Sequence, residues 1–149
     1  MVFEETQRFP LTLLVGIGVF ILLLAAVMSI FVIKTDRLAS FAAMSALFIP
    51  VAALFLLFKL ETLITAEEIT VRLAPLSGRS IGLAEISEVE AITYQPLRDF
   101  GGWGIRKGRG GTMYNARGND AVKLSLRSGE VVYIGTERPE KLVETLSAR

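Results

Sequence analysis

The chain has 149 residues, of which 52% are hydrophobic and 21% are charged, and its formal net charge is +1. It has no cysteine and no histidine, which excludes disulfide bonds, thiolate or imidazole metal sites, thiol nucleophiles and imidazole bases. We therefore expect no enzyme activity, no metal and no cofactor. Because basic and acidic residues nearly balance, we also expect no nucleic-acid partner.

Two long uncharged runs dominate the first part of the chain. Residues 11–33 carry no charge, and a helix of that length reaches roughly 34 Å, enough for a hydrocarbon core of about 30 Å. Residues 38–58 are also uncharged and follow after a connection of only a few residues. The sequence predicts two antiparallel transmembrane helices that form a hairpin over 11–58, with residues 1–10 as an N-terminal cap.

A cleaved signal peptide is the alternative interpretation of the first run. Such a peptide has a basic start and a shorter apolar stretch, whereas Glu4, Glu5 and Arg8 give this start no positive excess. We therefore expect a multi-pass protein of the cell membrane. Arg72 and Arg79 lie beyond the hairpin and favour a cytoplasmic C-terminal domain.

Small residues recur at intervals of four within both uncharged runs. Ala25 and Ser29 form one such pair, and Ala42 and Ala46 form another. This spacing lets helix backbones approach closely. We expect these four residues to pack the hairpin against itself, and the alternative is that they bind an oligomer partner or other membrane subunits.

After Lys59 the pattern changes to the alternation typical of strands. Ile69, Val71 and Leu73 alternate with polar residues, and residues 122–127 and 131–135 flank a Ser-Gly turn that predicts a hairpin. Pro139 suits the first position of a terminal helix. Residues 60–149 are therefore expected to form a soluble domain of antiparallel strands closed by a C-terminal helix.

Two motifs in this domain resemble those of a known group. Residues 101–106 read GGWGIR, and residues 135–142 read GTERPEKL. Together with the strand order they are similar to small bacterial membrane proteins that carry a pleckstrin-homology-like (PH-like) domain, an uncharacterised group. The resemblance covers roughly residues 60–149. It implies an α+β membrane protein in which a two-helix transmembrane hairpin precedes a PH-like antiparallel β-barrel or bent sheet, closed by a C-terminal helix.

The resemblance also implies a binding or scaffolding role, because many members of that superfamily bind lipid headgroups or proteins. One feature departs from the lipid-binding pattern. The loop that would supply basic phosphate contacts contains Glu67 and Glu68, which repel a phosphate.

The segment 96–118 is rich in glycine and concentrates basic charge in a chain that is otherwise nearly neutral. Trp103, Arg106, Lys107 and Arg109 are the candidate contacts for anionic lipid headgroups or an acidic protein partner. The alternative is that Trp103 covers the core while the basic residues form the solvated face of an irregular strand.

We therefore expect an integral membrane protein that presents a binding or scaffolding domain at the membrane surface. The first alternative is an accessory subunit of a membrane complex, assembled through the hairpin. The second is a membrane-surface enzyme that uses Glu85, Glu88 and Glu90, which requires these carboxylates to lie in a cleft.

Overall fold

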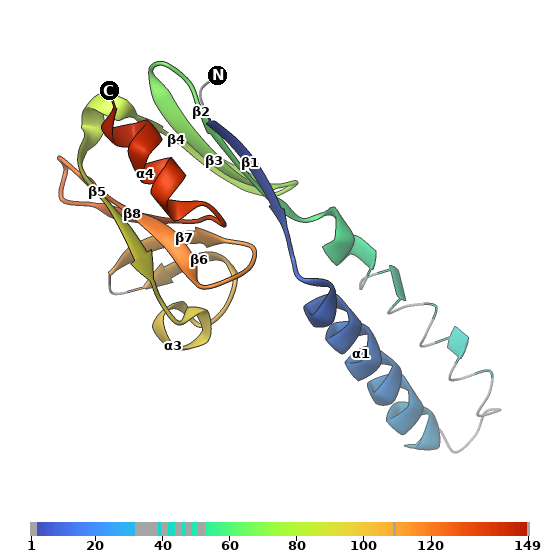
Figure 1. Ribbon diagram of the computed structural model, residues 1–149. Helices are drawn as coiled ribbons and strands as arrows, with labels where there is room; N and C mark the ends of the chain where they lie inside the picture. Colours follow the sequence, from blue (N-terminus) through green and yellow to red (C-terminus); the bar gives the residue numbers. More distant parts are fainter. Residues whose placement is uncertain are drawn as a thin grey trace. The chain divides into compact units, whose positions relative to one another are not determined.

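A computed structural model describes residues 3–31, 53–108 and 110–148, together with positions 39, 42, 43, 46, 49 and 50. The chain forms two compact units. Met1–Arg8 and Lys59–Arg149 form the first, which we call the sheet unit, and Phe9–Phe58 form the second, which we call the helical unit (Figure 1).

The sheet unit begins with a four-stranded antiparallel sheet, sheet A, in the order β1-β2-β3-β4. Its strands are β1 (Phe3–Arg8), β2 (Lys59–Ile64), β3 (Glu68–Ala74) and β4 (Ser77–Gly82). Inward residues alternate with outward ones along β1 to β3, so one face of the sheet is buried. Because Arg8 pairs with Lys59, the chain leaves the sheet unit and returns to it at neighbouring points.

A second sheet, sheet B, has five strands in the order β5-β8-β9-β7-β6. They are β5 (Ile86–Thr93), β6 (Gly104–Gly108), β7 (Gly111–Asn115), β8 (Asp120–Leu126) and β9 (Val131–Gly135). The 3-10 turn η2 (Leu83–Glu85) joins the two sheets. Antiparallel pairing of β8 with β9 confirms the predicted hairpin, and β7 pairs with β9 in parallel, which the sequence did not predict.

Two short helices complete the sheet unit. They are α3 (Pro96–Phe100) and α4 (Pro139–Ser147), and Pro139 stands at the start of α4 as predicted. Leu142 and Leu146, one turn apart, are buried, and Figure 1 shows α4 lying over β5 and β8. The core lies between the inner faces of the sheets and α4, and its fully buried members include Leu60, Ile64, Ile69, Val71, Ile81, Val122, Leu124, Val132, Ile134 and Leu142.

A buried carboxylate fastens β1 to the start of α4. The Thr136 hydroxyl and the Glu137 amide each donate a hydrogen bond of 2.8 Å to Glu5. Arg138 Nε lies 3.4 Å from the same carboxylate, and the Arg138 guanidinium stacks 4.8 Å from the centre of the Phe3 ring. We call Glu5, Thr136, Glu137 and Arg138 the Glu5 network. It makes the residues before the apolar run an integral part of the sheet unit.

The helical unit contains α1 (Leu11–Phe31) and the 3-10 turn η1 (Phe55–Leu57). In α1 the residues Leu11–Met28 are long and apolar enough to cross a membrane. Almost none of that stretch is buried inside the structure, so its apolar side chains are available to an apolar solvent.

The predicted fold class is wrong in two respects. Among the described residues, one helix is long and apolar enough to span a membrane, so the hairpin of 11–33 and 38–58 and the two-span, multi-pass topology are not supported. Much of the second run, residues 38–58, lies outside the described residues, so no continuous helix of spanning length is described there. The positions described before η1 are helical, and the run ends in η1 before β2 begins at Lys59. The sheet unit also does not form the predicted PH-like barrel, because its strands form two sheets that do not close.

Candidate functional site

The predicted contact residues lie on and beside β6, the edge strand of sheet B. Trp103 immediately precedes the strand and is half-buried, and its Nε1 donates a 3.3 Å hydrogen bond to the Gly118 carbonyl oxygen. The Trp103 side chain is therefore already partly buried and hydrogen-bonded within the sheet unit. Arg109 lies outside the described residues.

Arg106 and Lys107 are both exposed, but they point to opposite faces of sheet B because side chains alternate along a strand. Arg106 pairs with Met113, and Met113 pairs with Tyr133, so Arg106 shares a face with Tyr133. We call this the outer face of sheet B. Lys107 lies on the face that also carries the buried Val132. The structure therefore separates the two residues.

The outer face of sheet B carries a hollow of about 680 Å³ beside α3. Three aromatic rings line it: Phe100 meets Tyr94 at 5.8 Å and Tyr133 at 5.2 Å between ring centres, both edge to face. The sequence does not predict this aromatic hollow, because its rings come from three separate segments. Its remaining lining residues are Ile92, Arg98, Asp99, Gly108 and Gly110.

Hydrogen bonds hold the Tyr94 hydroxyl in place at the aromatic hollow. Asn115 Nδ2 donates a hydrogen bond to Tyr94 Oη and another, of 3.3 Å, to the Gly118 carbonyl oxygen, while the Arg117 amide donates to Asn115 Oδ1 at 2.9 Å. Burial raises the pKa of Tyr94 to about 12, although the hydrogen bond from Asn115 opposes the shift. Tyr94 is thus a neutral, fixed part of the hollow at physiological pH.

Arg98 and Asp99 line the hollow, and Arg106 lies on the same face of sheet B outside the lining. Asp99 is used as a helix cap, since its Oδ2 accepts a 2.8 Å hydrogen bond from the Gln95 amide at the start of α3. In the part of the chain that the structure describes, neither Arg98 nor Arg106 forms an ion pair, and Arg106 Nε donates only to the Trp103 carbonyl oxygen at 3.1 Å. Leu97, next to Arg98, is 70% exposed.

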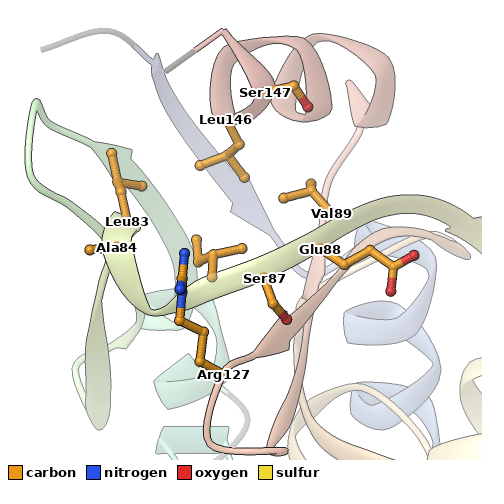
Figure 2. A pocket seen from close by; sticks show the side chains of 9 residues that line it. Leu83, Ala84, Ser87, Glu88, Val89, Arg127, Leu146 and Ser147 are labelled. Carbon is orange, nitrogen blue, oxygen red and sulfur yellow. The ribbon is translucent and has the colours of Figure 1, made fainter.

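A second hollow, of about 460 Å³, lies where η2, β5 and the end of α4 meet. Figure 2 shows Arg127 extending toward Leu83 and Ala84, with Leu146 and Ser147 contributed by α4. Ser87 also lines it but donates a 2.8 Å hydrogen bond to the Ser125 carbonyl oxygen. The remaining lining residues are Ile86, Glu88 and Val89.

The carboxylates of the enzyme hypothesis are exposed and engaged separately. Glu85 Oε1 accepts a 3.2 Å hydrogen bond from the Gly82 amide, Glu90 lies 3.3 Å from Lys123 Nζ, and Glu88 lines the hollow of Figure 2. Within the described residues, no group of three or more acidic side chains is arranged to hold a metal ion.

The residues predicted to pack helices are only partly visible. Ala25 is fully buried in the helical unit, while Ala42 and Ala46 are exposed. The side chain of Ser29 lies outside the described part of the structure. An apolar groove of about 350 Å³ follows α1 on the side of Gly18, where it meets Ile49.

No protein-family model matches this chain, and no curated protein is similar enough to it to indicate a relationship. The resemblance to PH-like membrane proteins therefore rests on the two sequence motifs and the strand order expected from the sequence. In the structure, the second motif serves the fold, because Thr136, Glu137 and Arg138 belong to the Glu5 network.

Proposed function

We propose that the protein is a membrane-anchored binding protein. In this proposal α1 anchors the chain in the cell membrane, and the sheet unit binds anionic lipid headgroups through the outer face of sheet B around α3. The observation that carries the proposal is the combination of two unpaired guanidinium groups, Arg98 and Arg106, with the exposed Leu97 on one face.

The position of β1 supports α1 as a retained anchor. By length and composition α1 also satisfies the requirements of a signal sequence. Cleavage after α1 would, however, remove β1 from sheet A and Glu5 from its buried partners. Since a buried charge network is costly to break, a folded sheet unit favours an intact N-terminus.

The same pairing gives the topology of the proposal. Because β1 and β2 are neighbours in one sheet, the strand before α1 and the whole of residues 59–148 share one side of the membrane, so the chain between Phe31 and Lys59 must return to the side from which α1 starts. Arg8, Lys59 and Arg72 lie at the end of sheet A where the chain enters and leaves the helical unit. The positive-inside rule then favours the cytoplasm for the sheet unit.

The chemistry of the proposed face suits an anionic lipid surface. Arginine forms bidentate hydrogen bonds with phosphate and carboxylate groups, and an exposed leucine beside it can enter the interfacial layer. Each basic residue near an anionic membrane contributes about 1 kcal/mol. Removing both Arg98 and Arg106 should therefore weaken the preference for anionic lipid by roughly 30-fold, since about 1.4 kcal/mol corresponds to a factor of ten.

Trp103 is the only tryptophan in the chain and makes a direct test possible. The full chain is reconstituted in nanodiscs of phosphatidylcholine, with or without phosphatidylserine, that contain a trace of dansyl-labelled lipid. Energy transfer from Trp103 to dansyl reports how close this region lies to the bilayer. We expect transfer to rise with phosphatidylserine and to fall again at high salt.

The double variant R98Q/R106Q should lose this increase, and R127Q/K141Q, which removes two exposed cations elsewhere, should retain it. An equal loss in both variants would indicate unspecific charge attraction. Transfer that is the same in neutral and anionic discs at low salt would contradict the proposed headgroup contact.

A further inference from the structure

One end of sheet A carries the points at which the chain leaves and re-enters the sheet unit. Arg8 ends β1 and pairs with Lys59, which begins β2 and in turn pairs with Ala74, the last residue of β3. The β3–β4 turn, Pro75 and Leu76, therefore lies at this same end. We call this turn the Leu76 turn.

Leu76 projects from the domain. Its side chain is 65% exposed, and its amide donates a 2.9 Å hydrogen bond to the Leu73 carbonyl oxygen, which closes the turn. Among the described residues of the sheet unit, Leu97 is the other large apolar side chain with comparable exposure. A leucine held at the tip of a tight turn therefore contributes little to the core of the domain.

The length of the linking chain limits how far α1 can begin from sheet A. Only Phe9 and Pro10 separate Arg8 from Leu11, so the first residue of α1 lies at most about 11 Å from Arg8. The turn lies two strands away from Arg8, which is about 10 Å at 4.8 Å per strand. A membrane that α1 enters at Leu11 is thus within reach of the turn.

The charges at this end of sheet A suit a headgroup layer. Arg8 and Lys59 form its last residue pair on the side of β1 and β2, and Arg72 lies two residues before the end of β3. Glu61 is the acidic side chain among them, and it pairs with Lys59 at 2.6 Å. Arg8 and Arg72 form no ion pair within the part of the chain that the structure describes.

We propose that the Leu76 turn inserts into the interfacial layer of the bilayer that α1 enters, with Arg8 and Arg72 at the level of the lipid headgroups. The proposal rests on the proposed function in one respect, because it requires α1 to lie in the membrane. It adds a second membrane contact, separate from α3, that would fix the orientation of sheet A at the surface.

The chain contains no cysteine, so single cysteines can be placed and labelled with a nitroxide. The full chain in lipid nanodiscs is labelled in turn at Leu76→Cys, at Glu67→Cys and at Val19→Cys. Glu67 lies in the β2–β3 turn at the opposite end of sheet A, and Val19 is an exposed residue in the middle of α1. Collision rates with oxygen and with a water-soluble nickel complex report depth in the bilayer.

We expect an oxygen-to-nickel ratio several-fold higher at position 76 than at position 67, and the highest ratio at position 19. A label at Ser77→Cys keeps Leu76 in place, and adding Leu76→Asp should then return the ratio at 77 to the value at 67. If the label at position 19 is lipid-exposed while the labels at 76 and 67 have the same low oxygen-to-nickel ratio, the inference about the Leu76 turn is wrong. The proposal that α1 is the membrane anchor is then unaffected. A wet position 19 would overturn both the anchor and this inference.

Discussion

Replacing Glu5 with alanine should strongly destabilise the sheet unit. The Glu5 carboxylate is 7% exposed and accepts hydrogen bonds from Thr136, from the Glu137 amide and from Arg138. Gln7 Nε2 donates to it as well. The variant leaves these donors without their acceptor and Arg138 without its buried partner. Since Arg138 is 43% exposed, the main cost is that of the buried donors left without an acceptor, about 1–3 kcal/mol.

Denaturant unfolding of the full chain in non-ionic detergent, followed by Trp103 fluorescence, measures this loss. With a urea dependence of about 2 kcal/mol per molar, the midpoint should fall by roughly 0.5–1.5 M. Glu4→Ala is the matched control, because its side chain is exposed on the same strand, and it should change the free energy of unfolding by about 0.5 kcal/mol or less. Equal midpoints for the two variants would refute the role of the Glu5 network.

Three further predictions concern the sheet unit. Gly111→Ala should destabilise it severely in denaturant titrations, because Gly111 has φ 134° and a side chain there would collide with the Val131 carbonyl oxygen. Arg79 holds the pKa of Glu130 below its usual range, so this pair stabilises the fold above that range and the stabilisation disappears as the pH falls; Glu130→Gln should flatten the acid limb of the stability–pH profile. Burial raises the pKa of Tyr94 to about 12, so its stabilising contribution is present below pH 10 and lost as the pH rises toward 12; a Tyr94→Phe variant should lack the tyrosinate absorbance step near pH 12.

The sequence was informative where local periodicity decides structure. Alternating Val122, Leu124 and Leu126 predicted β8 and the hairpin, and Pro139 with the leucine stripe after it predicted α4. These elements depend on neighbours only a few residues away. The unbroken apolar run likewise predicted α1.

The sequence did not predict structure correctly where a segment depends on distant partners. The inward residues of β1 include Glu5 and Gln7, which are polar and are buried only because β2 and residues 136–138 surround them. No pattern within residues 3–8 indicates that partner. The second apolar run has the composition of a spanning helix, but its end forms η1 and leads into β2, whose position is set by pairing with β1 and β3 rather than by composition.

The candidate site shows the same division. Arg106 and Lys107 are adjacent in sequence and therefore lie on opposite faces once β6 forms. The aromatic hollow combines Tyr94, Phe100 and Tyr133, which only the strand order β5-β8-β9 and the position of α3 bring together. Its rings resemble ordinary core residues when the sequence is considered alone.

The most direct test of the account is to express the full chain, extract membranes with alkaline carbonate, and determine the intact mass of the protein in each fraction. The account predicts that the chain stays in the membrane pellet with Phe3–Arg8 still attached to α1. A soluble protein whose mass shows that the chain begins after α1 would contradict the retained anchor and, with it, the proposed membrane-surface function.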